Sequence, residues 1–86
     1  MTDIDRVARR IAEIMIAELR LEGVTVETFD PEMDLVDELG IDSMDLATVA
    51  LALQDEFGIR IHPKDYEELL TLNKIATYIM ERRAAA

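Results

Sequence analysis

The stretch Glu38-Leu39-Gly40-Ile41-Asp42-Ser43-Met44-Asp45 joins a long acidic segment to a strongly periodic apolar one. Gly40 can adopt a positive φ angle, which allows a sharp turn. Asp42 and Ser43 are both residue types that accept hydrogen bonds from the free amides of a helix N-terminus. We therefore expect an exposed serine hydroxyl where a loop ends and a helix begins. A lone serine there is most often only a cap, but a helix N-terminus also favours an anion, so a phosphodiester on Ser43 would be well placed.

The segment before this stretch predicts one helix and a long connection. Apolar residues recur at spacings of three and four from residue 3 to about 21, which is typical of an amphipathic helix. Thr2 or Asp3 can cap it, and Gly23 is expected to end it. Residues 22–42 form the connection, with a helical turn near 35–39. The residues expected to face the core are Val24, Val26, Phe29, Leu35 and Leu39.

Three further helices are predicted after Ser43. The first spans 43–57 and ends at Gly58. Ile59-Arg60-Ile61 is then an extended link, Pro63 suits the first position of a short helix over 64–70, and Thr71 caps a final helix over 72–83. The expected inward residues of that last helix are Leu72, Ile75, Ala76 and Ile79.

The helix predicted over 43–57 is apolar on two sides, whereas a surface helix needs only one apolar stripe. One stripe contains Leu46, Val49, Ala50, Leu53 and Phe57, and the other contains Met44, Ala47, Thr48 and Leu51. Either the helix is covered all round or the second stripe faces a partner. The acids that flank Met44 favour the partner.

Composition limits the classes of function. The chain has 86 residues, which suits one domain over 1–86, and it has no cysteine, which fits a reducing cytoplasm. Its formal net charge is −10, and no Lys or Arg lies between Arg20 and Arg60. Such a field disfavours nucleic acid and anionic membranes and attracts basic partners. We expect a monomer without membrane insertion. We also expect no metal site, since Leu35 and Ile41 stand where a calcium loop needs Gly and Glu.

The whole chain resembles the acyl carrier protein family, through Glu38–Ser43 and through Asp55-Glu56-Phe57-Gly58-Ile59-Arg60-Ile61. The resemblance implies an all-α, four-helix bundle of three main helices and a short third one, with a long loop after the first. It also implies that Ser43 carries 4′-phosphopantetheine derived from coenzyme A. The thiol of that arm would hold an acyl or aminoacyl group as a thioester. The protein would then have no catalytic residue and would not be an enzyme.

The same resemblance implies partners and two sets of residues. The partners are a phosphopantetheinyl transferase and acyl or aminoacyl ligases and transferases with basic docking surfaces. The residues expected to dock them are Asp42, Met44, Asp45, Ala47, Thr48, Leu51, Asp55 and Glu56. A cargo tail would insert between the second and third helices, where the lining residues are expected to be Leu46, Val49, Ala50, Leu53, Phe57, Ile61, Tyr66 and Leu69.

Several positions depart from the family pattern. Thr48 replaces a usual glutamate, Ala47 is smaller than the usual valine, and Tyr66 is bulky where small residues are common. These departures favour a specialised carrier with a closed pocket and a small or polar cargo, although Tyr66 could instead turn to solvent. The open alternatives are an aminoacyl or D-alanyl carrier, an acidic helical adaptor, and a small enzyme that would need His62 as the base for Ser43.

Overall fold

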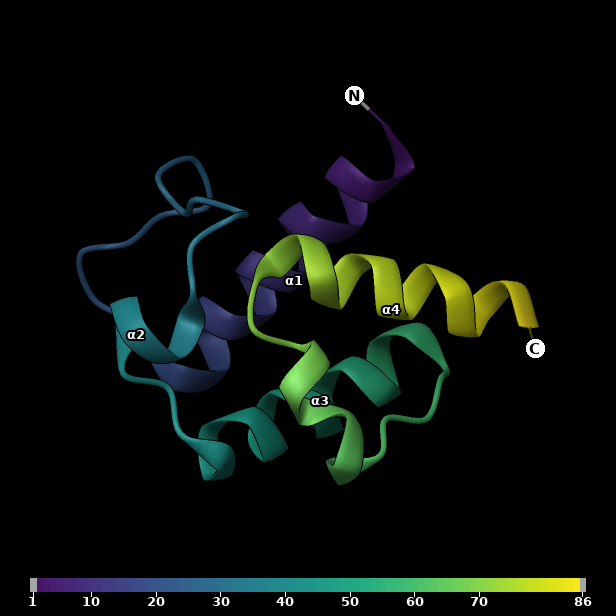
Figure 1. Ribbon diagram of the computed structural model, residues 1–86. Coiled ribbons are helices and arrows are strands. Elements are labelled where there is room, and N and C mark those ends of the chain that lie inside the picture. The colour runs from purple at the N-terminus through teal and green to yellow at the C-terminus, as the bar shows by residue number, and fades with distance from the viewer. Residues whose placement is uncertain (1, 86) are drawn as a thin grey trace.

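The computed structural model describes residues 2–85, and within this range all regular structure is helical. Its elements are α1 (Asp3–Leu19), α2 (Leu35–Leu39), α3 (Ser43–Phe57), the 3₁₀ helix η1 (Pro63–Glu68) and α4 (Leu72–Ala85). Figure 1 shows α1, α3 and α4 as the long helices, with η1 linking α3 to α4. The predicted all-α bundle with a short third helix and a long loop after the first is confirmed.

Helix α1 begins as expected and ends earlier than expected. The Thr2 hydroxyl accepts a hydrogen bond from the Asp5 N–H, and the Asp5 carboxylate accepts one from the Thr2 N–H. The helix stops at Leu19 because Arg20 adopts a left-handed conformation with φ of 52°. The prediction that Gly23 ends this helix was wrong: an arginine takes the cap position that glycine usually fills, and Gly23 makes a later turn at φ 74°.

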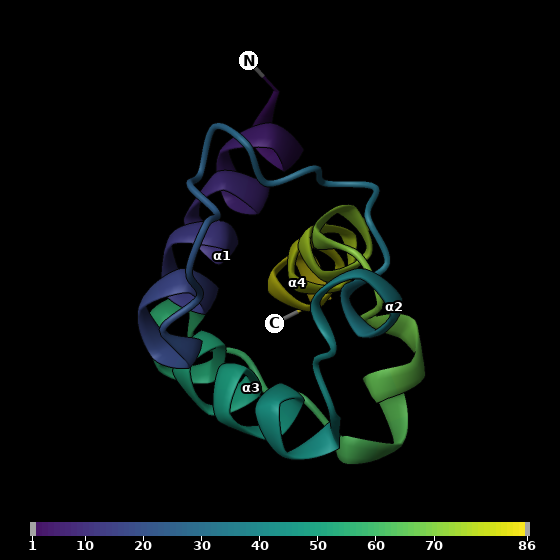
Figure 2. The ribbon, with the colours of Figure 1, turned by 90° about the vertical axis from the view of Figure 1, so that its left-hand side faces the viewer.

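The core lies between α1, α3 and α4. Figure 2 looks along α4, with α1, α3 and η1 arranged around it. The predicted inward residues of α4, which are Leu72, Ile75, Ala76 and Ile79, are all buried. Tyr78 is also buried, which the apolar spacing did not predict. One stripe of α3 faces this core, and we call it the inner stripe; it contains Leu46, Val49, Ala50, Leu53 and Phe57. The opposite side of α3 is left outside.

The long connection is tied to the start of α4. The Leu35 N–H donates to the Leu70 carbonyl at 2.8 Å, and the Asn73 N–H donates to the Pro31 carbonyl at 3.1 Å. Phe29 and Leu35 are buried, and Leu39 is half-buried, as predicted; Val24 and Val26 also pack against the core. These contacts fix α2 and therefore the turn that precedes α3.

The last two helices differ from the prediction in type and length. The segment predicted as a helix over 64–70 is a shorter 3₁₀ helix, with Pro63 in its first turn and no side-chain cap from His62. Leu69 follows it and is buried. The Thr71 hydroxyl accepts the Lys74 N–H at 3.1 Å, as expected of a cap, but α4 continues to Ala85. None of the helices described here is long and apolar enough to cross a membrane.

Candidate functional site

Ser43 is the first residue of α3, and its side chain is exposed. The cap is Asp42, whose carboxylate accepts the Asp45 N–H at 2.9 Å, while the Asp45 carboxylate accepts the Asp42 N–H at 3.3 Å. This reciprocal capping box caps the helix without the serine and leaves the Ser43 and Met44 N–H groups of the first turn free. The Ser43 hydroxyl is therefore left facing outward at the positive end of the helix dipole.

The residues before Ser43 hold this geometry in place. Asp34 caps α2, its carboxylate accepting the Val36 and Asp37 N–H groups at 2.9 Å each. Gly40 ends α2 in the left-handed region at φ 66°, where a side chain would be strained. Ile41 is then only 2% exposed. The turn at Gly40 and the buried Ile41 together bring the chain to the surface at Asp42.

Three residues of the second apolar stripe of α3, which are Met44, Thr48 and Leu51, are exposed, so this side of the helix is not covered within the fold. Met44 is 78% exposed and Leu51 is 65% exposed, and Thr48 and Asp55 lie on the same side at helical spacing. We call these four residues the outer stripe. The Thr48 hydroxyl donates to the Met44 carbonyl at 3.1 Å, so it is already satisfied within the helix. The outer stripe thus offers two large apolar side chains to a partner.

The other predicted docking residues lie elsewhere on α3. Ala47 is half-buried. Asp42 and Asp45 are engaged with each other in the capping box. Glu56 binds Arg10 of α1 at 2.8 Å, and this bond lowers the pKa of the Glu56 carboxyl. Glu56 therefore faces the α1 side and is paired within the molecule, away from the outer stripe.

The residues predicted to line a cargo pocket come together in the interior. Leu46, Val49, Ala50, Leu53, Ile61 and Leu69 are buried, and Phe57 and Tyr66 are half-buried against them. Tyr66 packs against the core with part of its surface exposed. The set occupies one continuous core, which is close-packed as protein interiors are.

The sequence analysis did not predict a group of polar side chains that joins Asp65 to Tyr78 and Arg82. The Asp65 carboxylate accepts a hydrogen bond from the Tyr78 hydroxyl at 2.7 Å and another from the Arg82 guanidinium at 3.1 Å. The Arg82 guanidinium also lies over the Tyr78 ring, 4.6 Å from its centroid. Burial, followed by the bond to Asp65, raises the pKa of the Tyr78 hydroxyl. The spacing of Tyr78 and Arg82 along one helix face could have indicated their contact, but nothing in the sequence connects Asp65 to them.

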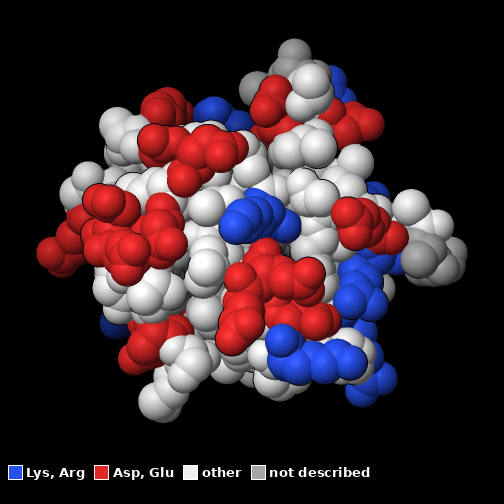
Figure 3. Space-filling view, viewed as in Figure 1, with Lys and Arg blue, Asp and Glu red and all other residues white. Residues whose placement is uncertain are grey.

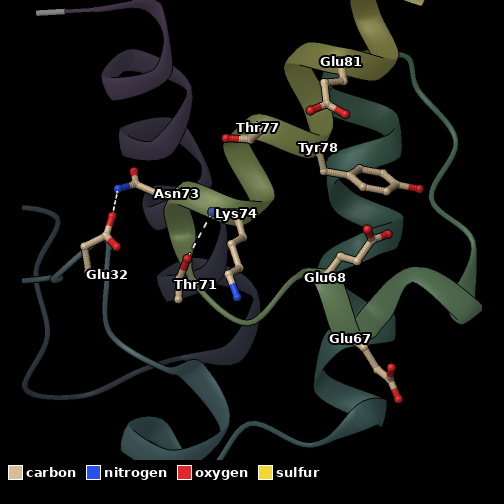
Figure 4. A pocket seen from close by; sticks show the side chains of 9 residues that line it. All are labelled: Glu32, Glu67, Glu68, Thr71, Asn73, Lys74, Thr77, Tyr78 and Glu81. Carbon is tan, nitrogen blue, oxygen red and sulfur yellow. Dashed lines mark hydrogen bonds between the residues drawn. The ribbon is translucent and has the colours of Figure 1, made fainter.

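A polar groove of about 470 Å³ lies on α4 and η1 and not at Ser43 (Figure 4). Lys74 lies in it among carboxylates, and Asn73 hydrogen-bonds to Glu32 at its edge. The lining residues are Glu32, Glu67, Glu68, Thr71, Asn73, Lys74, Thr77, Tyr78 and Glu81. Nothing in its lining relates it to the serine.

Acidic side chains lie over much of the surface. Figure 3 shows them across this face, with one group on the left over the region of α2, and basic side chains mostly at the lower right. Along the sequence, Asp37, Glu38, Asp42 and Asp45 lie close to Ser43. In general, a field of one sign increases the association rate of partners with the opposite charge.

Comparison with known proteins agrees with this geometry. Residues 9–79 match the family model described as the phosphopantetheine attachment site. The acyl carrier protein of Nitratidesulfovibrio vulgaris (strain Miyazaki F) is 34% identical over 77 residues, covering 90% of this chain and 97% of that protein. The chain belongs to the acyl carrier protein family. The acyl carrier protein of Syntrophobacter fumaroxidans is 32% identical over 83 residues, covering 96% and 99%, and that of Desulforapulum autotrophicum is 38% identical over 68 residues, covering 79% and 87%.

Membership of the acyl carrier protein family defines the general role. The protein is a carrier and not an enzyme, its cofactor is 4′-phosphopantetheine, and it holds its cargo as a thioester. Phosphopantetheinyl transferases and biosynthetic enzymes are its partners as a class. The start of α3 fits this cofactor, because an exposed hydroxyl lies beside the free first-turn amides that favour a phosphate.

Proposed function

We propose that Ser43 is the residue that carries the 4′-phosphopantetheine arm, and that the chain acts as a single carrier domain. The observation that carries this proposal is the division of roles at the start of α3. Asp42 and Asp45 cap the helix, and this leaves the Ser43 hydroxyl exposed and uninvolved in the cap. Ser43 is also the only serine in the chain. In this role it is the substrate of a transferase and not a nucleophile of its own enzyme.

The outer stripe is the surface on which we expect partners to dock. Met44 and Leu51 supply apolar contact, and acids on both sides of them supply attraction to basic surfaces. A long flexible arm then increases the effective concentration of the cargo at each partner's active site. The chain's own residues bind and orient the partner, and they leave the chemistry to it.

We further propose that the carrier is specialised for a small or polar cargo. Tyr66 packs against the interior and fills volume that smaller residues would leave empty. Thr48 and Ala47 give the α3 surface a different outline from the glutamate and valine usual in the family, which favours partners outside ordinary fatty-acid synthesis. An aminoacyl or D-alanyl cargo agrees equally well with these features. Loading the purified arm-bearing protein with a panel of acyl and aminoacyl ligases distinguishes the cargo classes.

The attachment site is tested by mass spectrometry after incubation with a phosphopantetheinyl transferase and coenzyme A. We expect the mass of one arm on the native protein, and none on Ser43→Ala with the same circular dichroism spectrum. Met44→Leu is the matched control: it replaces the residue next to the serine with an apolar one of similar volume and should still gain the arm. An arm on Ser43→Ala would show that another residue is used. A native protein that gains none would favour the adaptor alternative.

A further inference from the structure

The 3₁₀ helix η1 is attached to the rest of the fold by few strong contacts. None of the residues within Pro63–Glu68 is buried, and His62 supplies no side-chain cap. Hydrogen bonds in a 3₁₀ helix are also less favourable than those in an α-helix. Just before it, the Ile61 N–H donates to the Gln54 side chain of α3 at 2.8 Å. Just after it, Leu69 is buried in the core. The ends of η1 are thus anchored, while its own turns depend on side-chain contacts.

Asp65 makes the polar side-chain contacts between η1 and α4. Its side chain is only 14% exposed, although it is a carboxylate, and it accepts from both Tyr78 and Arg82 of α4. The phenol is itself fixed, since Tyr78 is 8% exposed and lies under the Arg82 guanidinium. We call Asp65, Tyr78 and Arg82 the Asp65 cluster. A nearly buried carboxylate that lost these donors would be costly, so the cluster resists any displacement of η1 from α4.

The cluster holds η1 beside the apolar interior that α3 presents. Figures 1 and 2 show η1 next to α3, rising at an angle to it towards the start of α4. The inner side chains of α3, Leu46 and Leu53 among them, are buried in one core together with Leu69, which follows η1. A long apolar chain can enter this interior only if η1 moves away from α4 or if the core side chains rearrange, because close-packed interiors leave little free space.

We propose that Asp65 is a positioning residue that holds η1 against α4 and thereby keeps the interior beside α3 closed to long acyl chains. The proposal rests on the proposed function, in which an arm on Ser43 presents such chains. In the native protein, short or polar cargo stays outside. When the Asp65 cluster is broken, η1 moves more readily and longer chains become buried.

The test compares the native protein with three variants. Tyr78→Phe keeps the ring under Arg82 and removes only the hydroxyl that binds Asp65, so it is the variant most certain to fold. Asp65→Ala removes both hydrogen bonds. Glu67→Ala is the matched control, because Glu67 lies on the same 3₁₀ helix, is exposed and is not a member of the cluster. Each protein is given the arm and loaded with chains of two to sixteen carbons, and its melting temperature is measured.

We expect a melting temperature independent of chain length in the native protein and in Glu67→Ala. In Tyr78→Phe and Asp65→Ala the melting temperature should rise by about 4 °C or more when the chain is lengthened from eight to sixteen carbons. A shift of this size is typical of a modest gain in stability in a domain of this length. A purely structural role for Asp65 would lower all the melting temperatures and leave them independent of chain length. That result in folded variants, or a rise through twelve carbons in the native protein, would overturn the proposal.

Amide hydrogen exchange of the protein without its arm separates failure of this inference from failure of the proposed function. Exchange within residues 63–69 should be about tenfold faster in Tyr78→Phe than in the native protein, and unchanged in Glu67→Ala. This measurement needs no arm, so it tests the attachment of η1 even if Ser43 is not modified. Equal exchange in the native protein and Tyr78→Phe would show that the Asp65 cluster does not hold η1 in place.

Discussion

At the scale of single residues, the start of α3 divides two roles between neighbours. Both Asp42 and Ser43 are suitable N-cap residues, but only one residue can occupy that position. In this protein the aspartate does, through bonds of 2.9 and 3.3 Å with Asp45, and the serine becomes the first helical residue. The same acids lie next to the serine, so Asp42 can act both on stability and on partner attraction.

Two substitutions of Asp42 should separate these effects. Asp42→Ala should lower the free energy of unfolding by about 1 kcal/mol, because the cap is lost. Asp42→Asn should keep most of that stability, since asparagine caps about as well, yet slow the transferase reaction because one negative charge is removed. Urea unfolding and the initial rate of arm addition measure the two quantities. Equal stability of native and Asp42→Ala proteins would contradict the capping role, and an unchanged rate in Asp42→Asn would contradict the charge role.

At the scale of the element, α3 serves two sides at once. Its inner stripe is buried in the core and packs on α1, and its outer stripe is exposed. At 1.5 Å per residue the helix is about 20 Å long, so docking contacts and Ser43 lie on one rigid rod. Rigid presentation of the serine is the benefit of placing it at the start of this helix and not within a loop.

Leu51→Ala should weaken the transferase reaction without changing the fold. Leu51 is 65% exposed, so little core packing is lost, but burial of a leucine against a partner contributes roughly 1.5–3 kcal/mol. We expect kcat/KM for arm addition to fall roughly tenfold, with the melting temperature unchanged. Ile4→Ala on α1 is the matched control, because Ile4 is another large exposed aliphatic residue, at 39%. Equal losses in both variants would mean that the outer stripe is not the docking surface.

At the scale of the whole molecule, the charge balance opposes compactness. The net charge is −10, and the span between Arg20 and Arg60 contains acids and no Lys or Arg. Among the described residues, the ion pairs between separate segments join α1 to its surroundings, as in Arg9 with Glu27 and Arg10 with Glu56, or join η1 to α4 through Asp65 and Arg82. The acids around α2 and the start of α3 therefore repel one another while they attract basic partners.

Added salt should raise the melting temperature and slow arm addition. Screening weakens repulsion among the acids, which stabilises the compact state, and it also weakens attraction to a basic transferase. Thermal unfolding and initial rates are measured from low salt to 0.3 M NaCl, with MgCl₂ at matched ionic strength as the comparison. A melting temperature that does not rise would show that the acids are already well separated or paired.

Local patterns were sufficient for most of the helices and for the serine. The spacing of apolar residues determined α1, α3 and α4, and Gly40, Asp42 and Ser43 determined the turn and helix start, because these features depend on backbone preferences within a few residues. The end of α1 was misplaced because Arg20 adopts a left-handed conformation that a sequence rule reserves for glycine. The length of η1 was misjudged because its 3₁₀ turns carry no helical apolar stripe.

The contacts between distant segments were decided only by the tertiary structure. Asp65 and Tyr78 are 13 residues apart, and Arg10 and Glu56 are 46 apart, so no periodicity relates the members of either pair. Packing brings them together: burial of the α4 core residues turns Tyr78 towards η1, and packing of α1 on α3 sets Glu56 beside Arg10. The sequence thus determined where an exposed serine begins a helix, whereas the arrangement of helices decided which acids are paired within the molecule and which side chains join η1 to α4.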